Sequence, residues 1–274
     1  MRKATQTPTA KPVRKPNRYH AIIEQVFKRH YQPGLEEFEF SRSEFDEFAT
    51  LLGIVLPKNL GDILYTFRYR SELSDDIRKT ATDGKEWIIE GAGRAVYRFR
   101  QVRRNRIVPR EELLTIKIPD ATPEIIANYA LSDEQALLAK VRYNRLVDIF
   151  LGIAAFSLQN HLRTTVKAVG QIEIDEIYVG VDRHGRQFVV PVQAKGGNDK
   201  HGVVQTQQDI SYCSQKFPGL ICRAVSAQFM SDQRIAMFEL TVQAGETRVV
   251  EERHYQLVSA SEISSADLEQ YSMR

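Results

Sequence analysis

The sequence predicts a mixed protein of the α+β or α/β class, in which a mostly helical N-terminal half precedes a half built around one β-hairpin. Three observations predict this order. Apolar residues recur at three- and four-residue spacing between residues 19 and 67, as in amphipathic helices. Two β-rich, alternating segments flank a turn at 182–185, as in a hairpin. A helical pattern over 203–217 lies between β-rich segments, which predicts a crossover with parallel strand pairing.

Length and composition set the frame for this fold. The 274 residues are enough for two domains, and 42% hydrophobic with 27% charged residues is typical of soluble globular proteins. No stretch approaches the roughly 18 apolar residues of a membrane span, and no signal peptide is visible, so we expect a cytoplasmic protein without membrane contact. The two cysteines and six histidines show no zinc spacing. We divide the chain into a flexible basic arm (1–18), an N-terminal domain (19–115), a connector (116–132) and a C-terminal domain (133–274).

The net charge of +3 is unevenly distributed. Residues 1–20 carry six basic residues and no acid, and residues 61–110 carry twelve basic against seven acidic residues. In contrast, residues 171–274 carry ten basic against fourteen acidic residues. This polarity favours a DNA-anchoring N-terminal half joined to a catalytic C-terminal half.

The N-terminal half reads as three helices followed by a hairpin. The first helix begins at Tyr19, the second covers 43–52 with Ser43 as its N-cap, and the third begins at Asn59. In the second helix, Phe45, Phe48, Leu51 and Leu52 are expected to share one face. Two β-rich runs around Gly91-Ala92-Gly93 then predict a hairpin. This order is that of a winged helix-turn-helix, a common DNA-reading module.

The expected wing and its exit are rich in arginine. Residues 90–110 hold seven basic residues and one acid, so contact with DNA phosphates is the favoured interpretation. The alternative is that the arginines pair with acids of the run 35–47. The candidate DNA-binding residues are Arg94, Arg98, Arg100, Arg103, Arg104 and Arg106.

A long helix is expected from Ser132, which forms a capping box with Gln135, to about Leu162. Its middle is apolar nearly all round, so the helix should be buried from more than one side. Asp148 is the single carboxylate in that buried part. It is either a metal ligand or the ion-pair partner of Arg145.

The hairpin 171–195 carries polar residues on its strands. Glu173 and Asp175 share one face of the first strand, and Gln193 and Lys195 share one face of the second, because side chains alternate in a strand. A three-residue loop Arg183-His184-Gly185 places Asp175 opposite Gln193, and Gly185 suits the left-handed last position of such a loop.

A two-residue loop would instead pair Asp175 with Ala194 and bring Glu176 to the Gln193 face. We favour the three-residue loop and keep Glu176 as the alternative.

A carboxylate, an amide and a lysine on one sheet face are the parts of a Mg²⁺-dependent phosphodiesterase. Mg²⁺ takes one or two carboxylates plus phosphate and water oxygens. A lysine lowers the pKa of a metal-bound water or steadies the charged phosphate. The alternative interpretation is a half-exposed hairpin with solvated charges.

These residues resemble the signature of the PD-(D/E)xK nuclease superfamily, in which an Asp on one strand precedes Glu/Gln-x-Lys on the next. The matching residues are Asp175 and Gln193-Ala194-Lys195, and the Gln-x-Lys form is similar to the Mrr-type branch. No Pro precedes Asp175, and Gln193 stands where Glu is usual. The resemblance covers roughly 133–230 and implies a restriction-endonuclease-like core of αβββαβ order. It also implies that the preceding helix contributes an acid, for which Asp148 is the candidate.

The resemblance implies a Mg²⁺-dependent endonuclease of type II restriction or phage-defence type that hydrolyses double-stranded DNA. Asp175, Gln193 and Lys195 would be its catalytic residues, and Asp175, Gln193 and Asp148 would hold the metal. One rival is a DNA-binding regulator with an inactive nuclease-like domain, and another is a repair, junction-directed or RNA-directed nuclease. A homodimer is left open as the assembly.

Overall fold

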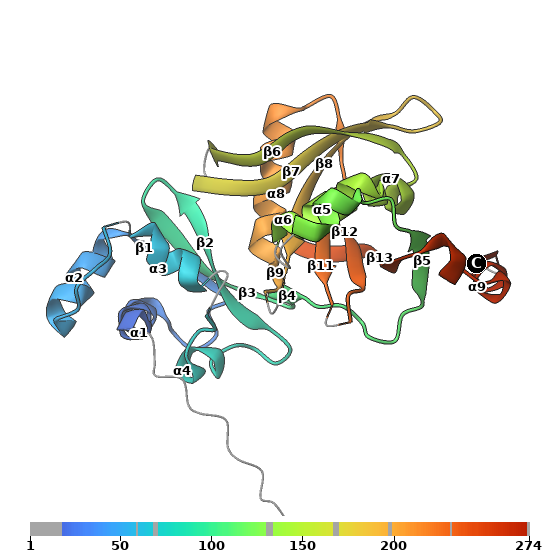
Figure 1. The fold of residues 1–274 in the computed structure, drawn as a ribbon. Helices are drawn as coiled ribbons and strands as arrows, with labels where there is room; N and C mark the ends of the chain where they lie inside the picture. Colours follow the sequence, from blue (N-terminus) through green and yellow to red (C-terminus); the bar gives the residue numbers. More distant parts are fainter. Residues whose placement is uncertain are drawn as a thin grey trace, which may run out of the picture.

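The computed structural model describes residues 18–58, 60–67, 71–129, 134–166, 170–196, 199–230 and 232–272. They form a mixed α+β protein with a three-stranded N-terminal sheet and a large mixed sheet of eight strands (Figure 1). The predicted α+β class is confirmed at this level. The expected arm, 1–18, lies outside the described residues except for its last position.

The small sheet and the helices beside it make up the N-terminal part. Its strands have the order β1-β3-β2 and are all antiparallel. The expected first and second helices are confirmed, and the third is a short helix just after Asn59, which itself lies outside the described residues. The elements in chain order are α1 (Arg18–His30), β1 (Glu37–Ser41), α2 (Ser43–Leu52), α3 (Gly61–Tyr65), α4 (Asp75–Arg78), β2 (Glu86–Gly93) and β3 (Val96–Val102).

Two details of α2 differ from expectation. The N-cap is Arg42 rather than Ser43, and the Ser43 backbone N–H donates a hydrogen bond to the Ser41 hydroxyl oxygen. Phe45 and Phe48 are buried against the small sheet as predicted. Leu51 and Leu52, in contrast, are 72% and 37% exposed, because the buried face of α2 consists of Phe45, Phe48 and Ala49.

Strand β1 was not predicted, and it changes the reading of the arginines. It pairs with β3, so Glu37 lies opposite Arg100 and Glu39 lies opposite Arg98. The Arg98 guanidinium donates a 2.7 Å hydrogen bond to Glu39, while Arg100 binds Glu90 on β2. The alternative interpretation, in which the arginines pair with acids of residues 35–47, is therefore confirmed for Arg98.

The long helix expected from Ser132 to Leu162 is wrong. Residues 131–133 lie outside the described part, and the helix is then broken into α6 (Glu134–Tyr143) and α7 (Leu146–Leu151). Arg145 and Gly152 both have left-handed backbone angles, and such residues end helices. Residues Ala154–Val166 form strand β6 instead, with Phe156 and Leu158 exposed at the edge of the large sheet.

The central hairpin has the predicted register. Strands β7 (Gly170–Val181) and β8 (Gln187–Lys195) are antiparallel, and the printed pairs run from Val181 opposite Gln187 to Glu176 opposite Val192. The Asp182 N–H donates to the Arg186 carbonyl, so the loop holds the residues between them. Gly185 has a φ of 77°, the left-handed conformation that this loop requires.

The remaining elements extend the sheet beyond β8. The crossover after Lys195 is confirmed, because β11 runs parallel to β8. The stretch expected to be a connector contains an edge strand, β5, paired with β13. These elements are β4 (Arg106–Ile107), β5 (Thr115–Pro119), α5 (Glu124–Tyr129), β9 (His201–Gly202), α8 (Val203–Lys216), β10 (Ile221–Cys222), β11 (Ala224–Phe229), β12 (Ile235–Gln243), β13 (Glu246–Val258), a 3-10 turn (Ala260–Glu262) and α9 (Ser265–Ser272).

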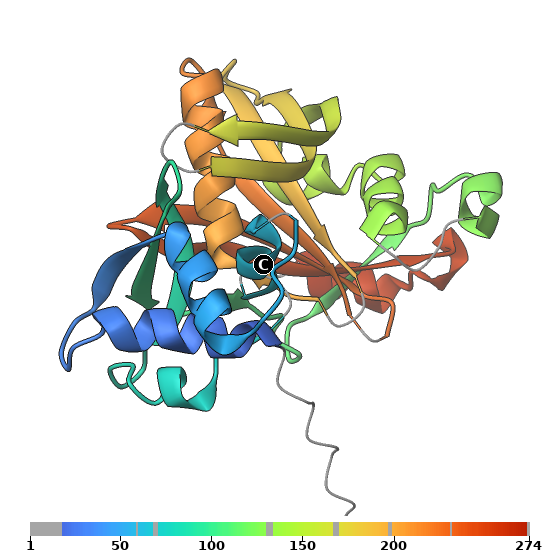
Figure 2. The ribbon, with the colours of Figure 1, turned by 90° about the vertical axis from the view of Figure 1, so that its left-hand side faces the viewer.

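Helices cover both faces of the large sheet. Helices α6 and α7 pack on one face, and α8 crosses the other (Figures 1 and 2). Alternate side chains of β8 point to opposite faces of the sheet. Val190 and Val192 pack with α6 on one face, and Val189 packs beside Cys213 of α8 on the other. Within the described ranges, no helix is long and apolar enough to cross a membrane.

The two sheets share a hydrophobic cluster. Ile88, Val102 and Ile107 from the N-terminal side pack with Val203 of α8 and Phe238 of β12. Strands β4 and β9 also pair across the same junction. Apolar contacts and backbone hydrogen bonds therefore join the N-terminal part to the large sheet.

Candidate functional site

The candidate site lies where the regular pairing of β7 and β8 ends. Beyond Glu176 and Val192, side chains replace the ladder hydrogen bonds. The Ala194 N–H donates to Asp175 Oδ2 at 2.8 Å, and the Gln193 side-chain N–H donates to the Glu173 carbonyl at 2.9 Å. Asp175 and the end of β8 are therefore in direct contact, as the three-residue loop predicted.

Lys195 stands at the end of β8 and meets a residue that the sequence interpretation missed. Its ammonium nitrogen lies 3.3 Å from Glu134 Oε1, at the start of α6. Only 12% of the Lys195 side chain is exposed. Burial raises the pKa of Glu134, Lys195 opposes this rise, and the nearby Asp175 adds to it. Glu134, Asp175 and Lys195 thus form one electrostatic group.

A second unexpected acid, Asp209 of α8, lies against Gln193. The Gln193 amide donates a 3.0 Å hydrogen bond to Asp209 Oδ2, and both residues are almost fully buried. Burial raises the pKa of Asp209 well above its usual range, although the bond from Gln193 favours the ionised form. The proximity of Asp175 raises it further.

The pKa of Asp175 is raised as well. Burial is the main cause, and the Lys195 ammonium and the Ala194 N–H partly offset it. Three carboxyl groups around one lysine are therefore all harder to ionise than in water. A cation bound among them would favour their ionised forms, since a nearby positive charge lowers the pKa of an acid.

The donor set of the site consists of hard oxygen atoms. Asp175 Oδ1 and Gln193 Oε1 accept no hydrogen bond from any described residue, so both remain available to a cation. Among the described residues, no three His, Cys, Asp or Glu side chains are close enough to form a metal cage. One carboxylate and one amide oxygen, completed by water and phosphate oxygens, fit Mg²⁺ better than Zn²⁺.

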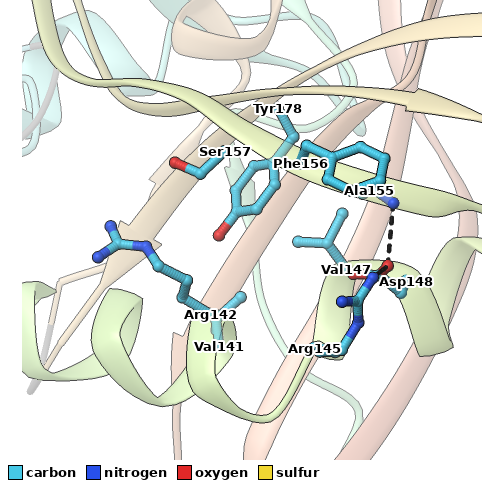
Figure 3. A pocket seen from close by; sticks show the side chains of 9 residues that line it. All are labelled: Val141, Arg142, Arg145, Val147, Asp148, Ala155, Phe156, Ser157 and Tyr178. Atoms are coloured by element: carbon cyan, nitrogen blue, oxygen red, sulfur yellow. Dashed lines mark hydrogen bonds and ion pairs between the residues drawn. The ribbon is translucent and has the colours of Figure 1, made fainter.

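Asp148 does not belong to this site, so its expected role as a metal ligand is wrong. It forms an ion pair with Arg145 and accepts a 2.9 Å hydrogen bond from the Ala155 N–H (Figure 3). Helix α7, which carries it, packs on the sheet face opposite α8, whereas Gln193 faces α8. The alternative interpretation, pairing with Arg145, is confirmed.

Asp148 instead lines a pocket of about 280 Å³ between α6, α7 and the start of β6 (Figure 3). Glu176, the alternative to Asp175, lies beside this pocket. It is fully buried and binds Arg142 at 2.9 Å and the Ser157 hydroxyl. It therefore faces α6, away from the Gln193 side chain, and the two-residue loop is excluded.

Five of the six candidate DNA-binding arginines separate into two groups. Arg98 and Arg100 are engaged within the protein, and Arg100 also binds Gln207 of α8 at 3.2 Å. Arg94, Arg103 and Arg104 are exposed, and none of them has an ion-pair partner in the part of the chain that the structure describes.

The segment after the exposed pair Arg103 and Arg104 is joined to the segment after Lys195. The next strand, β4, pairs Arg106 with Gly202 in the segment that follows Lys195. The pKa of the buried His201 is lowered to about 3. Burial is the main cause, and the positive charges of Lys195 and Arg106 lower this pKa further. A backbone connection therefore joins the arginine-rich exit of β3 to the end of β8.

Comparison of the chain with protein-family models, with curated proteins and with solved structures gives no match. The chemistry of the site therefore carries the functional assignment.

The two missed acids had weak signals in the sequence. Glu134 stands inside the expected capping box, where an acid is explained by the helix dipole alone. Asp209 had a stronger signal, because it lies within a helix whose neighbouring positions Val203, Val204 and Cys213 are buried. A buried acid on such a face requires a partner, and Gln193 is that partner.

Proposed function

We propose that this protein is a Mg²⁺-dependent DNA endonuclease of restriction or phage-defence type, with a nuclease core that resembles the PD-(D/E)xK superfamily. The observation that carries the proposal is the meeting of Asp175, Gln193 and Lys195 at one end of the hairpin, in the predicted register. Apart from the two-residue strands β9 and β10, the order from α6 to β11 is two short helices, three strands, a helix and a strand, which is similar to the αβββαβ order that the resemblance implies.

Each residue has a role in this proposal. Asp175 and Gln193 would hold Mg²⁺ through their unpaired oxygen atoms, and the bound ion would supply charge neutralisation at the scissile phosphate. Lys195 would orient the attacking water and stabilise the negative charge that develops on the phosphate. Glu134 contacts the Lys195 ammonium and limits its rotamers, so it acts as a positioning residue.

The N-terminal part would bind the duplex. Its order of helix, strand, helices and hairpin, with β3 between β1 and β2, resembles that of winged-helix modules. Arg103 and Arg104 would contact phosphates next to the cleavage site, because β4 and β9 connect their segment with the residues after Lys195.

The rival function, a DNA-binding regulator with an inactive core, is favoured by two observations. The Lys195 ammonium is already paired with Glu134, and position 193 provides an amide in place of a charged ligand. An inactive site would keep these contacts for stability alone.

Plasmid cleavage separates the two functions. The purified protein is incubated with methylated and unmethylated plasmids, with Mg²⁺ or with EDTA, beside Asp175→Ala and Lys195→Ala. We expect Mg²⁺-dependent cleavage by the parent and a loss of orders of magnitude in both variants, with DNA binding retained. Glu124→Ala is the control, because that acid is exposed at the start of α5 and lies outside the site. Tight DNA binding without cleavage of any plasmid would favour the regulator.

A further inference from the structure

We propose that Asp209 is a positioning residue that holds the Gln193 side chain with its carbonyl oxygen turned toward the metal. This inference rests on the proposed function. An amide at position 193 has a single oxygen that can bind a metal, so it must be turned the right way. A carboxylate would need no such orientation, because both of its oxygens can bind.

The hydrogen bonds of Gln193 define a single orientation of its amide. The two N–H bonds of the amide have two acceptors, Asp209 Oδ2 at 3.0 Å and the Glu173 carbonyl at 2.9 Å. These acceptors come from different elements, α8 and β7. Rotating the amide by half a turn would place Oε1 against both acceptors and leave them without a donor, in a site where Gln193 is 1% exposed. The amide oxygen is therefore directed away from α8 and from Glu173.

The position of Asp209 makes this arrangement rigid. The side chain is 2% exposed and projects from the middle of a fourteen-residue helix, so it moves only with α8. The Glu173 carbonyl is part of the β7 backbone and is equally constrained. These two rigid acceptors, on α8 and β7, hold the N–H groups of the amide and thereby fix the direction of Gln193 Oε1. Hydrogen-bond partners outside the coordination sphere generally orient metal ligands in this way.

The same geometry explains the residue types. A carboxylate at position 193 would lack both N–H donors that now reach Asp209 Oδ2 and the Glu173 carbonyl. An amide at 193 and an acid at 209 are therefore complementary. The ligand atom on β8 is neutral, and the residue that orients it lies on α8.

The test compares Asp209→Leu and Asp209→Asn by calorimetric titration of the DNA-free protein with Mn²⁺, used as the probe for Mg²⁺. Asn keeps an oxygen acceptor for Gln193, whereas Leu removes it. We expect Asp209→Leu to weaken Mn²⁺ binding by about tenfold to a hundredfold, the usual effect of losing an outer partner, and Asp209→Asn to stay within about threefold of the parent. Cleavage of DNA should follow the same order.

The controls separate orientation from charge and from stability. Cys213→Ala removes another buried side chain one turn further along α8, so it loosens the same packing and should leave Mn²⁺ binding unchanged. Equal weakening in the Asn and Leu variants would assign the effect to charge and overturn the inference. Unchanged binding in both would overturn it as well.

Failure of the proposed function gives a different result. If the parent protein binds no Mn²⁺, the metal site itself is wrong, and the positioning role falls with it. If the parent binds Mn²⁺ and cleaves DNA while Asp209→Leu does the same, only the positioning role is wrong. If Asp209→Leu does not fold, the Asn variant still decides, because tenfold weaker binding there contradicts the inference.

Discussion

Lys195 at the end of β8 and Glu134 at the start of α6 are in contact, with the ammonium nitrogen 3.3 Å from Glu134 Oε1. The two residues are 61 positions apart in the chain and meet where β8 ends and α6 begins. A lysine with four flexible carbons would otherwise sample many rotamers. The contact therefore orients the ammonium group next to Asp175.

The first prediction concerns this contact. Glu134→Ala should lower single-turnover cleavage at saturating Mg²⁺ by about tenfold to a hundredfold, because Lys195 loses its orienting partner, and Lys195→Ala should lower it more. Glu124→Ala, at the first position of the exposed helix α5, is the matched control. A Glu134→Ala variant with parental cleavage would show that the contact is structural.

The second prediction concerns pH and stability. Since burial raises the pKa of Asp209, the folded protein keeps this proton at pH values where the unfolded chain, with a pKa of about 3.9, releases it. The parent should therefore lose stability as pH rises above about 4 through the folded-state pKa, and Asp209→Asn should lack this loss. The Tm of the variant relative to the parent, measured in EDTA, should increase between pH 4.5 and 7.5. A constant difference would contradict the raised pKa.

The third prediction concerns DNA affinity. Replacing Arg103 and Arg104 by Ala should weaken binding to all sequences and reduce the slope of log K against log salt by about two units, one for each lost phosphate contact. Arg98→Ala is the control, because its guanidinium binds Glu39 and should contribute little to DNA contact. An unchanged slope in the double variant would move the DNA surface elsewhere.

The fourth prediction concerns the junction between the two sheets. Ile107 is fully buried in the cluster shared by both parts, so Ile107→Ala should lower the free energy of unfolding by about 2–5 kcal/mol. Its neighbour Val108 is 46% exposed, and Val108→Ala should change that free energy by less than about 0.5 kcal/mol. The measurement is urea unfolding, followed by the single Trp87 and by circular dichroism. Two separate transitions in the parent would show that the parts unfold independently.

Local patterns in the sequence determined the central hairpin. The alternation of Ile with polar residues and the position of Gly185 together predicted the register of β7 and β8, because turn geometry and side-chain alternation act over a few residues. The helices α1, α2 and α8 were predicted for the same reason, since each carries its own apolar face.

Local patterns did not predict the secondary structure of an apolar segment that could form either a helix or a strand, because tertiary packing decides between the two. Residues 146–158 are apolar enough for a buried helix, but Arg145 separates α6 from α7, Gly152 ends α7, and pairing with β7 holds Ala154–Val166 as a strand. Strand β1 was missed similarly, because its five residues form a strand only with β3 as their pairing partner, although Glu37 and Glu39 already alternate with Phe38 and Phe40 in the sequence.

The sequence by itself therefore determined the candidates Asp175, Gln193 and Lys195 and the register that joins them. Only the tertiary structure decided their surroundings. It brought Glu134 to Lys195 and Asp209 to Gln193 across 61 and 16 residues of chain, and it left Asp148 on the other face. Such contacts depend on how helices dock on the two faces of a sheet, and docking is set by the shapes of the buried surfaces together rather than by the spacing of residues within one segment.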